Sequence, residues 1–569
     1  MRLSVAVCLF ALLALPVLCL CADSQRPDLA QVLYLSFDDT VAATADAAQA
    51  LGDGWQTGPA PIGKAQWQLQ RPRSTVSAKQ NGGKTVQSMR DERQQGKWRT
   101  RRIIFNNDGD DSWAPETKQE FLNLRTAPLV GSHVDTIFYG TAQSLGSHSH
   151  NSRAAELSAA PGTMAHRFIE QGTDNLEVMV DFCHTNGIEV FWSLRMNDTH
   201  DYSNENMRPR WKSEHPEYLI GTPDNPPRCY TWTSADFSHS WVRTKVFRIV
   251  RDVCERYDVD GIELDFFRHL CYFKTPSYGG VATEEEIAAM TDLVRRIRAM
   301  ADEQGARRGR PILIAMRLPD SLDYCRALGL DLQSWLEDDL LDILVVGGYM
   351  QLNPWEYSVG LGKTYGVPVY PSLDESRHRD KEACKRRMTL ETYRARAAEA
   401  WEAGMDGIYV FNVFDPRNPL WNELGDPEKL RGLSKTYFVN YRTTHHAKQY
   451  LATGEQYVTI PHLDPVYPMV LQPGQSAATT VTIGDDPSSM PQTATVVLRL
   501  EPAEAAVGIA VSANGHALEA GTHSGGWMEY AVPASALLRG ANSIEVRLGA
   551  DAPAQAGMTD LELCVEYEE

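Results

Sequence analysis

Eight short segments rich in Val, Ile and aromatic residues alternate with amphipathic helical segments between residues 101 and 414, and this alternation constrains the fold most. Several segments are nearly continuous apolar runs, as expected for strands that are covered on both faces. The helical segment from Trp241 to Tyr257 places its valines on one stripe. The predicted strands are Arg101–Asp108, Val134–Gly140, Ile188–Asn197, Asp260–Phe267, Pro311–Pro319, Leu341–Tyr349, Val367–Asp374 and Asp406–Phe414.

Eight β/α units predict an α/β fold, a (β/α)8 TIM barrel over residues 101–445. The alternative is a doubly wound open sheet. That fold would need fewer strands and usually carries a glycine-rich first turn. The sequence has neither GxGxxG after a predicted strand nor GxxxxGK[ST], which favours the barrel.

The N-terminus resembles a secretory signal peptide over residues 1–22. Arg2 precedes an apolar run that ends near Ala22 and is followed by polar residues. This predicts a secreted or periplasmic protein. The alternative is a membrane anchor, because the run is about long enough to span a bilayer. For residues 23–100 we expect short strands and loops, with a first strand at Val32–Asp39.

The chain after the barrel changes character. Short alternating segments separated by Gly, Pro, Asn and Asp fill the region from Ala478 to Glu569. We therefore predict an all-β sandwich domain, jelly-roll-like, over residues 446–569. Its role is either structural support or sugar binding.

The charge and cysteine content argue against several kinds of binding partner and metal site. With 55 Lys and Arg against 74 Asp and Glu, the net charge is −19, which argues against a nucleic-acid partner and against an anionic membrane surface. An anionic substrate is not excluded, since a local pocket can be basic. Seven cysteines follow the signal segment without metal-finger spacing. Cys229 and Cys271 lie in predicted loops and are candidates for a disulfide, and the odd number leaves at least one thiol free or paired between chains.

The active site of a barrel lies at the carboxyl ends of its strands. There the sequence places carboxylates mixed with aromatic, amide and arginine side chains, a combination that suits sugar recognition. In the fourth predicted strand, period two directs Glu263 and Asp265 to the same face, and that face is the lumen because the other must meet helices. Two buried acids should have pKa values that are pushed apart, as acid/base chemistry requires. The alternative is a buried network with Arg195 or Arg317 that only holds the barrel together.

The segment from His239 to His269 resembles the fourth helix and strand of the glycosyl-hydrolase-like family 10 barrels, a group of bacterial extracellular glycosidases. The run NGIEVFWSLRMND, which ends at Asp198, is similar to the third strand of that family. The resemblance implies a glycosidase active site around Asp265. A weaker likeness to the strand-four motif of family 18 chitinases places Phe267 at the position of the catalytic Glu, which argues against that mechanism.

Glycoside hydrolysis needs a second carboxyl group on another strand end. The candidates are Asp320, Glu375, Asp374 and Asp198, of which we place Asp320 first and Glu375 second. Trp192, Tyr349 and Trp355 are expected to stack on sugar rings. The predicted substrate-binding residues are Trp192, Arg195, Asn197, Asp198, His200, Arg268, His269, Arg317, Tyr349 and Asn412.

These observations predict a secreted glycoside hydrolase-like protein that acts on a poly- or oligosaccharide and needs neither a cofactor nor a metal. The three arginines Arg195, Arg268 and Arg317 would suit an anionic sugar, uronic or sulfated. One alternative is a glycan-binding protein without turnover. Another is a metal-dependent carbohydrate hydrolase or deacetylase, since His148, His150, His200 and His269 lie near the same strand ends.

Overall fold

A computed structural model describes residues 84–441, 443–503, 508–524 and 526–568. The expected signal peptide and the strand at Val32–Asp39 lie outside the described residues. Helix α3 (Val86–Gly96) occupies the end of the segment for which we expected strands and loops. No helix among the described residues is long and apolar enough to cross a bilayer.

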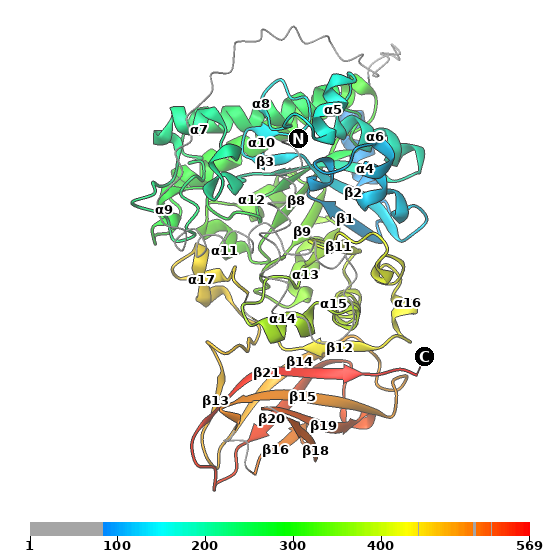
Figure 1. The fold of residues 1–569 in the computed structure, drawn as a ribbon, viewed down its shortest axis with the longest axis vertical. Helices are drawn as coiled ribbons and strands as arrows, with labels where there is room; N and C mark the ends of the chain where they lie inside the picture. Colours follow the sequence, from blue (N-terminus) through cyan, green and yellow to red (C-terminus); the bar gives the residue numbers. More distant parts are fainter. Residues whose placement is uncertain (1–83, 442, 504–507, 525, 569) are drawn as a thin grey trace, which may run out of the picture. The chain divides into compact units, whose positions relative to one another are not determined.

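A closed barrel of eight parallel strands confirms the predicted fold (Figure 1). The strands follow one another around the barrel in chain order, and β1 pairs with both the second and the last strand. Each predicted strand is found. The barrel strands are β1 (Ile103–Asn107), β2 (Val134–Gly140), β6 (Glu189–Arg195), β7 (Gly261–Asp265), β8 (Leu313–Leu318), β9 (Ile343–Val346), β10 (Val369–Leu373) and β11 (Ile408–Val410).

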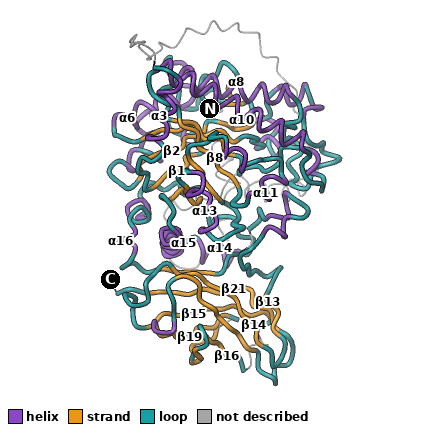
Figure 2. The backbone as a smooth tube through the Cα atoms, turned by 180° about the vertical axis from the view of Figure 1, so that it is seen from behind, coloured by secondary structure: helices purple, strands orange, loops and turns teal. Residues whose placement is uncertain are grey.

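Helices surround the barrel strands (Figure 2). Long helices follow the predicted apolar stripes, and α10 begins with a capping box formed by Thr283 and Glu286. A small sheet of β3 (Ala142–Ser144), β4 (Ser147–His148) and β5 (Glu156–Leu157) follows β2. The remaining helices are α4 (Lys118–Arg125), α5 (Met164–Glu170), α6 (Asn175–Thr185), α7 (Arg210–Glu214), α8 (Ser240–Arg256), α9 (Lys274–Ser277), α10 (Glu284–Arg308), α11 (Leu322–Ala327), α12 (Leu332–Glu337), α13 (Trp355–Tyr365), α14 (Lys381–Arg387), α15 (Leu390–Ala403), α16 (Pro427–Leu430) and α17 (Ala447–Tyr450).

Two antiparallel sheets form the predicted C-terminal sandwich. Strands such as β14 and β20 alternate between buried and exposed residues, and the buried residues of both sheets share one apolar core. One sheet contains β12 (Lys435–Phe438), β13 (Met469–Leu471), β15 (Thr493–Glu501), β18 (Glu519–Ser524), β19 (Trp527–Pro533) and β21 (Ala556–Val565). The other contains β14 (Ser476–Ile483), β16 (Ala510–Ala513), β17 (His516–Ala517) and β20 (Gly540–Arg547).

The sandwich is attached to the barrel by buried ion pairs and by close packing. Arg387 at the end of α14 is fully buried and pairs with both Asp560 and Glu562 of β21. Gly484 lies directly against the backbone of α15 at Ala398, where a Cβ atom would clash. Strand β12 precedes residue 446, the predicted start of the sandwich, yet it belongs to the sandwich sheet through its pairing with β21.

Candidate active site

Asp265 ends strand β7 and is fixed by four hydrogen bonds. Arg317 of the neighbouring strand β8 donates to it from Nε at 3.0 Å and from Nη2 at 2.6 Å. The backbone amides of Phe267 and Arg268 donate to its Oδ1. Both side chains of the ion pair are buried. Burial opposes the charge of the Arg317 guanidinium, but Asp265 outweighs it and raises the pKa of Arg317. The pair therefore fixes the orientation of the Asp265 carboxyl group at the carboxyl end of the barrel.

Glu263 lies one step deeper on the same face of β7, as the alternation predicted. Its carboxyl group accepts hydrogen bonds from Ser193 and, at 2.9 Å, from the hydroxyl of Tyr409. Burial, together with the nearby charge of Asp265, raises the pKa of Glu263 to about 7. Near neutral pH, Glu263 is therefore partly protonated. Glu263 and Asp265 are both buried, and a catalytic role for Glu263 stays a prediction.

The two acids that we placed first as partners of Asp265 are each held by other groups. Asp320 accepts the backbone amides of Leu352 and Asn353, and burial raises its pKa to about 6. Glu375 is held by His378 at 3.1 Å and by Arg396 of α15 at 3.4 Å. Neither acid has a contact with Asp265 among the interactions of the described residues. Asp320 fixes the loop after β9, and Glu375 lines a pocket together with Asp374.

Asp374 is the candidate acid that faces the lumen side. It follows Ser372 by two residues, and the hydroxyl of Ser372 lies 3.5 Å from Nη1 of Arg317. The amide group of Asn412, at the end of β11, donates to Asp374 Oδ2 at 2.8 Å. Asn412 adopts the left-handed conformation with φ of 58°. A non-glycine residue in this conformation is uncommon and is often found where a site imposes it. Arg317 therefore has Asp265 on one side and the strand that carries Asp374 on the other.

Several predicted sugar-binding residues are occupied by contacts within the protein. Asn197 holds the backbone of Ala235 and Cys271, and Arg195 pairs with Asp198 at 3.2 Å. Tyr349 accepts a hydrogen bond from Arg268 and stacks on His445. Arg195, Arg268 and Arg317 thus each contact a group within the protein. This weakens the prediction that the three arginines bind an anionic sugar.

The prediction that Trp192 stacks on a sugar ring is wrong. Its side chain is fully buried, and its indole nitrogen donates to Thr141 at 2.8 Å. It points to the outer face of β6, because Ser193 and Arg195 occupy the lumen face. There it packs against His148 and His150, so no ring face is left for a sugar.

Because His148 and His150 are buried, we expect the unfolding free energy to fall as the pH is lowered. Burial, and to a lesser degree Arg256, lowers the pKa of His150 to about 3 from 6.5. The unfolded chain therefore binds a proton below pH 6.5 that the folded chain does not bind. This costs about 2 kcal/mol of unfolding free energy at pH 5. In urea titrations, His150→Gln should lose about 2 kcal/mol less than wild type between pH 7 and pH 5. An equal loss in both proteins would contradict a buried neutral imidazole.

One group of three residues in the described chain has metal-ligating atoms within 4.8 Å of one another: Asp198, His200 and His269. His200 Nδ1 lies 2.6 Å from Asp198, and Arg268 Nη2 lies 3.2 Å from His200 Nε2. Although burial opposes it, His200 and Arg195 hold the pKa of Asp198 well below its usual range. Two arginines beside the group oppose a divalent cation. The residues fit a hydrogen-bonded network better than a metal centre.

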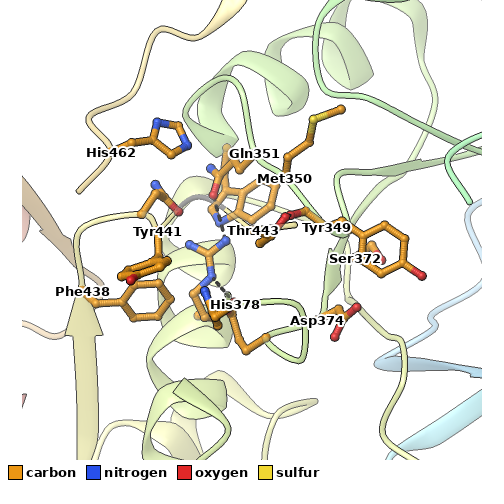
Figure 3. A pocket seen from close by; sticks show the side chains of 15 residues that line it. Tyr349, Met350, Gln351, Ser372, Asp374, His378, Phe438, Tyr441, Thr443 and His462 are labelled. Atoms are coloured by element: carbon orange, nitrogen blue, oxygen red, sulfur yellow. Dashed lines mark hydrogen bonds and ion pairs between the residues drawn. The ribbon is translucent and has the colours of Figure 1, made fainter. Parts of the chain in front are cut away.

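A small pocket, with a cavity volume of about 30 Å³, opens beside Asp374 (Figure 3). Its barrel side includes Tyr349, Ser372, Asp374 and Trp355. Glu375, predicted as a catalytic acid, lines the pocket too. Sequence reasoning missed several other lining residues. Strand ends were the only guide to the site, whereas His378 lies in a loop, Arg396 lies on α15, and Asn440, Tyr441 and His462 follow the barrel.

Comparison with known proteins gives limited information. No family model and no curated protein sequence matches the chain. Membership in the glycosyl-hydrolase-like family 10 therefore stays a prediction. Among solved structures, the glycoside hydrolase domain of PgaB (BpsB) from Bordetella bronchiseptica is 11% identical, with a TM-score of 0.38, over 58% of this chain and 99% of that chain.

Two further similar structures are also carbohydrate-active enzymes. A family GH18 chitinase from Chromobacterium violaceum is 12% identical, with a TM-score of 0.32, over 90% of this chain and 95% of that one. A cycloisomaltooligosaccharide glucanotransferase from Paenibacillus sp. is 10% identical, with a TM-score of 0.33, and the match covers 81% of this chain and 57% of that one. These scores are too low to support a statement about activity, which depends on the geometry of the site.

Proposed function

We propose that the protein is a glycoside hydrolase whose reaction takes place at the carboxyl end of the barrel, with Asp265 and Asp374 as its two carboxyl groups. The observation that carries the proposal is the position of Arg317. It holds Asp265 in a fixed orientation and also approaches Ser372, two residues before Asp374, which borders a pocket. Two carboxyl groups on opposite sides of one bond are what glycoside hydrolysis requires.

The roles follow from the surroundings of each acid. Asp265 forms a buried ion pair with Arg317, an arrangement that suits a nucleophile or a stabiliser of developing positive charge. Asp374 accepts hydrogen bonds from Asn412 and from the amide of Ser376, and no cation contacts it among the described residues. Asp374 lines the pocket, whereas Asp265 is held in a buried ion pair, so we assign Asp374 as the general acid.

The proposed location is outside the cell or in the periplasm. The signal-like N-terminus motivates this proposal, and a disulfide between Cys229 and Cys271 supports it. This bond, which the loop positions of the two cysteines predicted, joins the loop after β6 to the loop after β7. Structural disulfides persist mainly in oxidising compartments.

The test is the release of reducing ends from a panel of neutral, uronic and sulfated polysaccharides by the wild-type protein and by Asp374→Asn. Release by wild type that is lost in the variant supports the proposal and names the substrate class. Equal release by both proteins removes Asp374 from the mechanism.

A glycan-binding protein without turnover is the second candidate. It is favoured by the burial of Asp265, whose carboxyl group is engaged by Arg317 and two backbone amides and so has little access to a glycosidic bond. Retention on a glycan without release from any member of the panel would establish this alternative.

A further inference from the structure

We propose that the connection after β6, residues 196–239, forms with the beginning of α8 and the connection after β7, residues 266–283, an aromatic surface that binds a polysaccharide chain outside the reaction site. This inference rests on the proposed function, which it extends by assigning the protein a polymeric substrate and a place that holds it. Four of the seven exposed Trp, Tyr and Phe side chains among the described residues lie in this part of the chain: Tyr202, Tyr230, Trp241 and Tyr278.

One half of the aromatic surface is a group of packed rings at the beginning of α8. The ring centroids of Tyr218 and Trp241 lie 5.2 Å apart, with an angle of 23° between the planes, and His215 stacks on Tyr218 at 5.1 Å. His239 lies 5.0 Å from Tyr218 on another side. The buried indole of Trp211 supports Trp241 from within the fold at 5.3 Å. Trp241 is nevertheless 37% exposed, so this group of rings reaches solvent.

The other half is centred on Tyr230, which is 64% exposed. Its backbone has a φ of 62°, in the left-handed region that a bulky residue rarely adopts. A disulfide from Cys229 to Cys271 and a hydrogen bond of 2.9 Å from the Tyr230 amide to the Pro227 carbonyl hold the turn. Such strain persists only where the surrounding structure imposes it, and it is concentrated at functional sites such as ligand clamps. The turn thus presents an exposed ring on a fixed backbone, which reduces the ordering cost of binding.

A short two-stranded ribbon joins the two halves. Residues 218–221 run antiparallel to residues 232–236, and the amide of Ile220 donates to the carbonyl of Ser234 at 2.8 Å. The hydroxyl of Tyr278 donates to the carbonyl of Ile220 at 3.4 Å, which ties the connection after β7 to the same ribbon. Three steps of extended chain cover about 10 Å. The exposed rings are therefore spread over a surface and are not gathered in one pocket, an arrangement that suits a polymer.

The aromatic surface is built on the two loops that border Asp265. Cys271, which the disulfide joins to the turn at Tyr230, comes six residues after Asp265. Asn197 donates to the carbonyl of Cys271 and accepts the amide of Ala235. The preceding residue, Met196, donates its amide to the carbonyl of Asp265 at 2.9 Å. The loops that carry the exposed rings are thus fixed to the strand end where the reaction is proposed.

The composition of the aromatic surface favours a glycan over a protein partner. Its large apolar side chains that are exposed comprise four aromatic ones and one aliphatic one, Val281. Tyr and Trp combine a flat apolar face with a polar edge, which matches a sugar ring with its C–H face and hydroxyl edge. The charged groups between the rings pair with one another, Arg210 with Glu214 at 2.9 Å and His215 with Glu217 at 3.0 Å. Charges of both signs therefore surround the rings.

The experiment is affinity electrophoresis of the full wild-type chain in native gels that contain galactomannan, β-glucan, xylan, alginate or carrageenan. At least one of these polysaccharides should retard the protein. Trp241→Ala and Tyr230→Ala should each weaken binding about 3- to 10-fold, the effect of one stacking contact. Tyr230→Phe keeps the ring and should bind like wild type. Each variant is also made together with Asp374→Asn, because a glycan that is cut during the run would retard the protein less.

Trp98→Ala is the matched control. Trp98 is 51% exposed but precedes β1, so it lies at the amino end of the barrel strands and away from the aromatic surface. It should leave affinity unchanged. The aromatic surface is refuted as a glycan site if no polysaccharide retards the wild-type chain, or if Trp98→Ala weakens binding as much as Trp241→Ala does. Self-association in sedimentation velocity that Trp241→Ala abolishes, without glycan binding, would assign the surface to a second copy of the chain.

The outcome for the aromatic surface is separate from the outcome for the hydrolase. Glycan binding that depends on Tyr230 and Trp241, together with no release from any polysaccharide, would uphold the aromatic surface and reject the hydrolase. Release that requires Asp374, with binding that neither Tyr230→Ala nor Trp241→Ala changes, would uphold the hydrolase and reject the aromatic surface.

Discussion

Replacing Asp265 with Asn is expected to lower the unfolding free energy of the barrel by about 3–5 kcal/mol. The substitution keeps the shape of the side chain but removes the charge that Arg317 contacts through two hydrogen bonds. Arg317 is fully buried and cannot reach water in the folded chain, so its charge would lose its principal partner. The measurement is urea unfolding at pH 7, followed by tryptophan fluorescence.

Glu263→Gln is the matched control for this prediction, because it makes the same change two residues away on the same face of β7. Glu263 has a pKa of about 7 and is already partly protonated at neutral pH. Replacing it with Gln should therefore lower the unfolding free energy far less than replacing Asp265 with Asn. Combining Asp265→Leu with Arg317→Met should recover most of the loss, since a buried ion pair can be replaced by apolar groups of similar size. Equal effects of the two single amide substitutions would show that the ion pair does not hold the barrel.

The fold was predictable because it depends on local periodicity. Each barrel strand is a short apolar segment, and the helices between them carry continuous apolar stripes, so no long-range information was needed. Helix α3 escaped prediction because only Met89 and Arg93 of its residues are buried, which leaves almost no apolar stripe. Strand β12 escaped because its partner β21 lies more than a hundred residues away, and such pairing leaves no local signal.

The site was predictable only where alternation along a strand decides the direction of a side chain. Period two placed Glu263 and Asp265 in the lumen, and the same rule, applied to β6, would have placed Trp192 outside it. The sequence could not select the acid that partners Asp265. Asp320, Asp374 and Glu375 all follow their strands, where loop geometry sets the direction of the side chains. Tyr441 and Arg396 are not at strand ends at all, so only the folded structure brings them to the pocket.

Asp374→Asn is expected to reduce kcat/KM by about 10²- to 10⁴-fold, the usual contribution of a general acid, with little change in stability. The amide can still accept the hydrogen bond from Ser376, and no buried cation is left unpaired among the described residues. Asp320→Asn is the matched control. Asp320 is a buried acid that follows strand β8. It fixes the loop after β9 and does not line the pocket, so its substitution should change stability more than rate.

Asn412→Ala tests whether Asn412 orients the carboxyl group of Asp374 without taking part in the reaction itself. It removes the hydrogen bond to Asp374 Oδ2 and places a residue ill suited to the left-handed conformation at φ of 58°. We expect a smaller loss of kcat than for Asp374→Asn, with KM nearly unchanged and the largest loss on substrates with poor leaving groups, which need protonation most. Asn412→Gly relieves the strain without restoring the hydrogen bond, so it should recover stability but not rate. Full recovery of rate with Gly would mean that Asn412 serves the backbone turn and does not orient the acid.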